Sequence, residues 1–142
     1  MSLPEFTSRI LVALFCGLLI GLERQLSHKN AGMRTNALVA LGAAIYVLLS
    51  FEIIQQHDGD ITRIIGQVVT GVGFICAGVI FHQGINVQGL TTAATVWCSA
   101  GIGCMAAAGF FAEAFICTVI VTIVNAVLKL VDDWIERKEK NI

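Results

Sequence analysis

Two groups of polar residues interrupt a largely apolar sequence, and their types and spacing could do chemistry. In the first, Glu23 and Arg24 are adjacent, and Arg34 follows in the same polar stretch. In the second, "GLTTAATVWCSAG", the hydroxyls of Thr92 and Thr95 share one face if the segment is a helix. An acid among bases can form an ion pair, and hydroxyls can line a path for an ion or bond one helix to another. Neither group holds a nucleophile beside its base, so we predict neither an enzyme nor a bound cofactor.

The composition indicates that lipid surrounds most of the chain. Hydrophobic residues make up 56% and charged residues 13% of the sequence, and the mean hydropathy is +0.82. These values exceed those of a soluble domain of this size. The net charge of −1 gives no reason to expect nucleic-acid binding. The five cysteines all fall inside apolar runs, where we expect them to be packing residues.

Five apolar runs are long enough to cross a bilayer, allowing for tilt and for snorkelling of the flanking residues. The fold class predicted is therefore an all-α membrane protein with five transmembrane helices. We assign residues 1–131 to this membrane domain and residues 132–142 to a short cytoplasmic tail. The first run lacks a signal-peptide pattern and should stay attached as a span. The five predicted spans are Phe6–Leu22, Ala37–Phe51, Ile64–Phe81, Thr91–Ala108 and Phe110–Val131.

The distribution of Lys and Arg predicts the orientation. Basic residues in short loops tend to stay cytoplasmic. The first connection and the C-terminal segment together carry seven of the nine basic residues, and only Arg9 and Arg63 fall on the other side. We therefore expect the N-terminus outside and the C-terminus in the cytoplasm.

Small residues at helical spacing predict where the spans pack closely. In the first span, Gly17 and Gly21 form a G-x-x-x-G stripe that Arg24 continues. Packing against another helix of the same chain is favoured over a dimer seam, which stays an alternative. The third span has a similar stripe of small residues, which contains Gly66, Thr70, Gly73 and Ala77. This stripe predicts that the third helix is central in the bundle.

The fourth span carries hydroxyls and small groups on one stripe, which contains Thr92, Thr95, Ser99, Gly103 and Ala106. One interpretation is a polar crevice for an ion, lined by Gln67 and Thr70 of the third span with Thr92 and Thr95 of the fourth. The other, which we favour, is that these residues bond the two spans together. The mid-span positions contain no carboxylate, which counts against a proton- or cation-coupled transporter.

The first connection holds the remaining candidates. Arg34 can reach lipid headgroups or pair with Glu23, and Thr35 or Asn36 can cap the second span. A metal site formed by Glu23, His28 and His82 is an alternative without a local ligand spacing. The "HDGD" turn at residues 57–60 could attract a divalent cation, although a solvated turn is the simpler interpretation.

Four segments resemble the MgtC/SapB family of bacterial inner-membrane proteins. They are "GLLIGLERQ", "AGMRTNALVALGAA", "IIGQVVTGVGFICAGVI" and "INVQGLTTAATVWCSAGIG", which occur in the family's order and cover roughly residues 14–104. The resemblance implies a five-span domain, which many members extend with a soluble ACT-like domain. The chain ends at Ile142, so we do not expect that domain in it. The positions that match family motifs are Glu23, Arg24, Gly32, Arg34, Thr35, Asn36, Gly73, Gly78, Gly89, Thr91, Thr92, Ala93, Thr95 and Trp97.

The resemblance also implies a function. Family members are linked to growth at low magnesium and to virulence, that is, to the survival of pathogens within macrophages. The best-known members resemble regulators that contact other membrane proteins, including the F-type ATP synthase. We therefore expect a non-enzymatic inner-membrane regulator whose partners are the bilayer and other membrane proteins. Two alternatives stay open: a transporter or channel for magnesium or another ion, and a homodimeric scaffold joined through Gly17 and Gly21.

Overall fold

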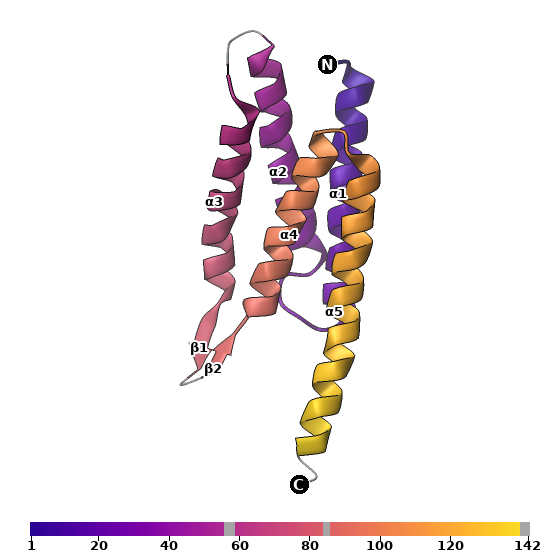
Figure 1. Cartoon of the computed structure of the whole chain (residues 1–142), viewed down its shortest axis with the longest axis vertical. Coiled ribbons are helices and arrows are strands. Elements are labelled where there is room, and N and C mark those ends of the chain that lie inside the picture. Colours follow the sequence, from indigo (N-terminus) through magenta and orange to yellow (C-terminus); the bar gives the residue numbers. More distant parts are fainter. Residues whose placement is uncertain (56–58, 84–85, 140–142) are drawn as a thin grey trace.

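The computed structural model describes the backbone of residues 1–55, 59–83 and 86–139, and the side chains of these residues except 82, 83, 86, 132–137 and 139. The five helices of these described residues run alternately up and down, with the two termini at opposite ends (Figure 1). We call the end with the α1–α2 connection, the β-hairpin and the C-terminus the lower end, as drawn in Figure 1, and the other the upper end. In chain order the elements are α1 (Leu3–Leu26), α2 (Met33–Ile54), α3 (Ile61–Val79), β1 (Phe81–Gln83), β2 (Asn86–Gln88), α4 (Leu90–Ala107) and α5 (Phe111–Glu139).

The described residues include five helices that are long and apolar enough to cross a membrane, which confirms the predicted number. Polar side chains cap the starts of two helices. Ser2 accepts a hydrogen bond from the backbone of Glu5 at 3.4 Å at the start of α1, and Asp60 accepts one from the backbone of Thr62 at 2.8 Å at the start of α3. The chain leaves α4 through Gly109, whose φ of +88° suits glycine.

A short β-hairpin between α3 and α4 was not predicted. The third helix ends at Val79, and Phe81, which we had placed in the span, pairs with Gln88 in an antiparallel ladder. Gly89 allows this return, because its φ is +89° and a Cβ atom there would collide with the carbonyl oxygen of Val79. The fold class is therefore all-helical except for two short strands.

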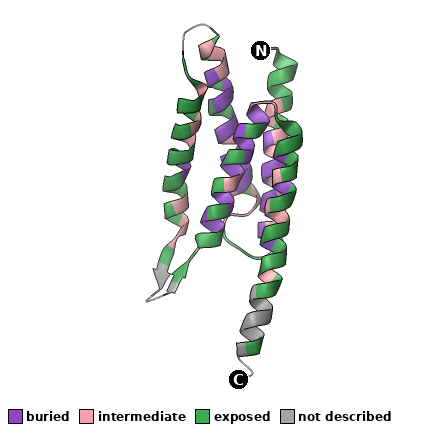
Figure 2. Cartoon of the chain, viewed as in Figure 1, coloured by how far each residue is buried: buried purple, intermediate pink, exposed green. Residues whose placement is uncertain are grey.

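The fourth helix, not the third, is the centre of the bundle. In the apolar stretch of α4, 61% of the residues are buried, against 6% in α3. Figure 2 shows most of the buried residues on α1, α2 and α4, and almost none on α3. The predicted central place of α3 is wrong: Val72 is its one buried residue, and Gly66 and Gly73 lie in open space. Small residues permit close packing, but their spacing does not determine which helix is covered.

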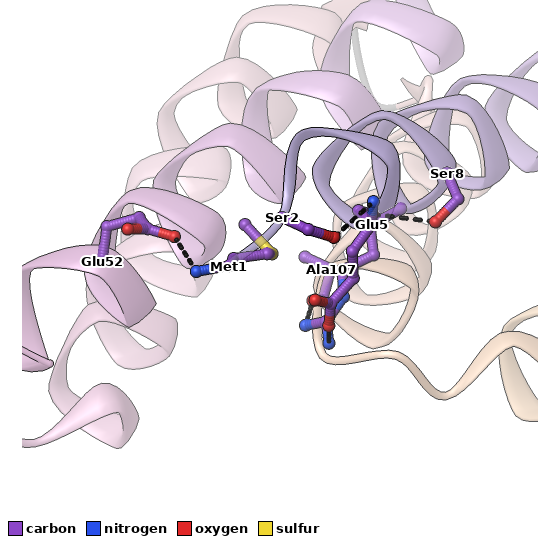
Figure 3. Close-up of polar contacts among 7 residues, drawn as sticks. Met1, Ser2, Glu5, Ser8, Glu52 and Ala107 are labelled. Carbon is purple, nitrogen blue, oxygen red and sulfur yellow. Dashed lines mark hydrogen bonds and ion pairs between the residues drawn. The ribbon is translucent and has the colours of Figure 1, made fainter.

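Charged groups join the helices at the upper end. The N-terminal amine of Met1 lies 3.1 Å from the carboxylate of Glu52 on α2, and the close-up in Figure 3 shows the two groups facing each other. Arg9 pairs with Glu5 at 2.6 Å and donates to the carbonyl oxygen of Ala107 at 2.7 Å. Because the last carbonyls of a helix have no partner within it, this arginine caps the C-terminus of α4.

Candidate functional site

Three buried polar side chains of α4 each bond to a different neighbouring helix. The positions 92, 95 and 99 follow the helical repeat, so they form one stripe facing the interior. We call the resulting set the α4 polar network. Its interhelical hydrogen bonds join Arg24 Nη2 of α1 to Thr92 Oγ1 at 3.0 Å, Asn125 of α5 to Thr95 Oγ1 at 3.2 Å, and Ser99 Oγ to Asn36 Oδ1 of α2 at 2.8 Å.

Arg24 brings a charge into this network. Its side chain lies in the last turn of α1 and is only 3% exposed. It forms no ion pair with the residues that the structure describes, and its Nε atom has no hydrogen-bond partner among them. A buried guanidinium is costly unless polar groups surround it. The hydroxyl of Thr92 is thus an important acceptor for Arg24.

Glu23 points elsewhere, although it is next to Arg24 in sequence. Its side chain is half-buried; Oε1 accepts a hydrogen bond from Ser27 at 2.7 Å, and Oε2 is buried without a partner in the described part of the chain. Of the two roles considered for Arg34, the ion pair with Glu23 does not form in the described structure. Glu23 lines a groove between α1 and α5, whereas Arg34 lines one between α2 and α3.

Asn36 links the network to the α1–α2 connection. Its amide donates to the carbonyl oxygens of Ala31 at 2.5 Å and Gly32 at 3.1 Å while its own oxygen accepts from Ser99. The predicted capping by Thr35 or Asn36 is wrong, because α2 begins earlier, at Met33, with Gly32 as its N-cap. Asn36 instead lies inside the first turn and holds the preceding loop from there.

Close helix contacts surround this network. A Cβ atom on Gly17 would lie 2.7 Å from the backbone oxygen of Asn36, and one on Gly21 would lie 2.8 Å from that of Gly32. On Gly103 it would collide with the carbonyl of Ala40 in α2. These glycines let the backbones of α1 and α4 approach α2. Gly17 and Gly21 therefore pack within the chain, as favoured, and a dimer seam through them would require α2 to move away.

The predicted crevice of polar residues from the third and fourth spans does not form. Gln67 and Thr70 are exposed on α3, and the hydroxyl of Thr70 bonds to the carbonyl of Gly66 in its own helix at 3.0 Å. Thr92 and Thr95 are buried against α1 and α5 instead. The preferred interpretation, that the hydroxyls join helices, holds for α4. The predicted partner, α3, is wrong, because these hydroxyls bond to α1, α5 and α2.

The other predicted positions lie on the surface. Thr91 and Trp97 are exposed on α4, and Ala77 is exposed on α3. Within the described residues there is no group of three His, Cys, Asp or Glu side chains that could hold a metal ion. The side chain of His82 and residues 57–58 of the "HDGD" turn lie outside that description. Asp60 caps α3, as given above.

Comparison with known proteins identifies the family. The model of the MgtC family matches residues 10–134. This chain belongs to the MgtC family. It is 49% identical over 117 residues to the protein MgtC of Brucella abortus, covering 82% of this chain and 48% of the relative. It is 48% identical over 129 residues to MgtC of Salmonella typhimurium, covering 91% and 54%.

An uncharacterized protein of Synechocystis is 41% identical over 138 residues, covering 97% of this chain and 58% of the relative. The chain thus spans about half the length of the curated relatives it matches. No solved structure matches it. The family resemblance found from the four segments is confirmed.

Sequence reasoning missed Asn125 and Arg9, which join helices in the described structure. Asn125 bonds to Thr95, and Arg9 bonds to the end of α4. Both carried a usable signal, because a polar or charged side chain inside an apolar span is expensive in lipid and usually faces the bundle interior.

Proposed function

We propose that this MgtC-family chain is a non-enzymatic protein of the bacterial inner membrane that modulates other membrane proteins, such as the F-type ATP synthase. The setting would be adaptation to low magnesium and survival within host cells. The N-terminus would lie outside and the C-terminus in the cytoplasm, so that the basic lower end faces the cytoplasm.

The α4 polar network is the observation that carries this proposal. Thr92, Thr95 and Ser99, the hydroxyls that a transport path would use, are buried in bonds between helices. The grooves described between α2 and α3 and between α1 and α5 include none of these three residues. The interior is thus engaged in holding the helices together, while α3 and α5 present apolar and small residues outward. Such surfaces suit contacts with other membrane helices.

ATP-driven proton pumping by inverted bacterial membrane vesicles tests the proposal. We expect the chain to reduce vesicle acidification, and Gly73→Leu on the exposed face of α3 to weaken that effect. Gly101→Leu on the exposed face of α4 is the matched control, because a Cβ atom at either glycine meets no other atom within 4 Å. Equal acidification with and without the chain would remove the ATP synthase as partner. Magnesium flux through liposomes containing only the purified chain would favour the transporter instead.

A homodimeric scaffold is a second candidate, with a different seam from the one predicted. The stripe of Gly66, Thr70, Gly73 and Ala77 lies exposed on α3 rather than inside the bundle. A Cβ atom at Gly66 or Gly73 would meet no other atom within 4 Å, so the stripe is free to accept a second helix. Replacing both glycines with leucine should then split a detergent-stable dimer. Persistence of that dimer would point to another interface.

A further inference from the structure

A groove separates α2 from α3 along much of their length. The two helices lie side by side in Figure 1, and the cavity between them has a volume of about 880 Å³. We call it the α2–α3 groove. Among the side chains that line it are Leu38, Val39, Tyr46, Val68, Val72 and Ile75.

Two glycines help to keep this groove open. Gly42 of α2 and Gly71 of α3 both line it, and a Cβ atom on either would meet no other atom within 4 Å. Glycine is a poor helix former, and here it permits no closer packing within the chain. The space beside these glycines is therefore available to something outside the chain.

Among the described residues that line the groove, one is positively charged, and it lies at the lower end. Arg34, in the first turn of α2, lines the groove, is exposed, and forms no hydrogen bond or ion pair with the residues that the structure describes. The neutral groups of Thr35 and Gln67 also line the groove. No described acidic side chain lines the groove. The charge thus favours a negatively charged group at this end, joined to an apolar part that follows the groove.

The length of the groove fits an acyl chain. From Arg34 to Tyr46 the groove follows α2 for about 18 Å, at 1.5 Å per residue, which is close to the roughly 15 Å of one leaflet of a bilayer core.

We propose that the α2–α3 groove binds a phospholipid with an anionic headgroup. The phosphate pairs with the guanidinium of Arg34, since a planar guanidinium can hold two phosphate oxygens at once. In phosphatidylcholine the choline cation lies next to the phosphate and repels the guanidinium, so a headgroup with a net negative charge binds more strongly. One acyl chain lies along the groove past Gly42 and Gly71. This lipid site is independent of which protein the chain contacts.

Native mass spectrometry of the purified chain with phosphatidylglycerol or phosphatidylcholine tests the site. We expect the chain to retain phosphatidylglycerol in preference, and Arg34→Gln to reduce that preference about tenfold. The control is Arg63→Gln, an exposed arginine of α3 that does not line the groove. Equal retention of the two lipids by the unaltered chain, or an equal loss in both variants, would overturn the role of Arg34.

A second pair of variants tests the path of the acyl chain. Gly71→Leu should fill the groove and remove the bound lipid, whereas Gly78→Leu on the same helix should not, because Gly78 lies outside the groove. Neither change meets another atom at Cβ, so both variants should fold. Equal lipid retention by the two would refute the proposed path. A dimer that disappears with Gly71→Leu but persists with Arg34→Gln would identify a second copy, not a lipid, as the occupant.

Discussion

Gly103→Ala should destabilise the bundle although alanine is the better helix former. A Cβ atom at this position would collide with the carbonyl oxygen of Ala40 and lie 2.8 Å from its carbonyl carbon. Both are backbone atoms of a packed helix, which cannot rotate away as a side chain can. Overpacking of this kind costs up to about 3 kcal/mol, and the gain in helix propensity offsets about 1 kcal/mol of it. The expected net loss in free energy of unfolding is about 1–2 kcal/mol.

Gly101→Ala is the matched control for this prediction. It lies two residues away on α4, is exposed, and has no other atom within 4 Å of a Cβ. Alanine there should stabilise the chain by about 0.5–1 kcal/mol. The two variants should therefore differ by roughly 2 kcal/mol, with opposite signs. Reversible unfolding in mixed detergent micelles, followed by circular dichroism, measures both. If Gly103→Ala is as stable as Gly101→Ala, α2 and α4 do not pack as closely as described.

Three further predictions concern polar groups. Thr92→Val should lower the free energy of unfolding by about 1.5–3 kcal/mol, because the buried guanidinium of Arg24 loses its hydroxyl acceptor. Thr91→Val, at an exposed position, should change the free energy of unfolding by less than about 0.5 kcal/mol. The same unfolding assay in micelles compares the two variants. Ser99→Ala should cost about 1–3 kcal/mol, since it leaves the amide oxygen of Asn36 buried without its donor; a stability equal to that of the unaltered chain would contradict the bond.

The third prediction is a pH effect at the start of α3. The hydrogen bonds from the side chain and backbone of Thr62 hold the pKa of Asp60 below its usual value. A lowered pKa in the folded state stabilises that state above the ordinary Asp pKa of about 3.9, and the contribution is lost as the pH falls through the lowered value. The protection factors of amides in the first turn of α3, corrected for the intrinsic pH dependence of exchange, should therefore fall with acid in the unaltered chain but not in Asp60→Ala. If the protection factors depended on acid equally in the unaltered chain and in Asp60→Ala, the Asp60 cap would not be the source of that dependence.

The number and rough positions of the helices could be read from the sequence. Runs of about 20 apolar residues can be satisfied in lipid only as helices, because every backbone polar group must then bond within its own segment. The β-hairpin escaped this reasoning, since Phe81 continues the apolar run of α3. What ends the helix is the return of the chain at Gly89, which is a contact between residues distant in sequence.

The sequence predicted the polar stripe of the candidate site but not its bonding partners. The spacing of Thr92, Thr95 and Ser99 indicated one buried stripe on α4, and burial of all three agrees with it. The helix that each would bond to did not follow from spacing, because any neighbouring helix can supply a donor or an acceptor. The polar partners on α1, α2 and α5 could have been recognised individually as intramembrane polar residues, but not matched to their bonds.

Local sequence by itself determined that this chain forms apolar helices and which face of α4 is polar. It also placed the helix boundaries to within four residues, except the end of α5, which lies eight residues beyond the predicted Val131. These features depend on periodicity and on the length of a bilayer. Only the tertiary structure decided that α4 is central, that α3 stands at the edge, and that Glu23 and Arg24 enter different surroundings. In lipid the apolar faces of all helices are nearly equivalent, so close backbone contacts and buried hydrogen bonds between distant residues select the arrangement.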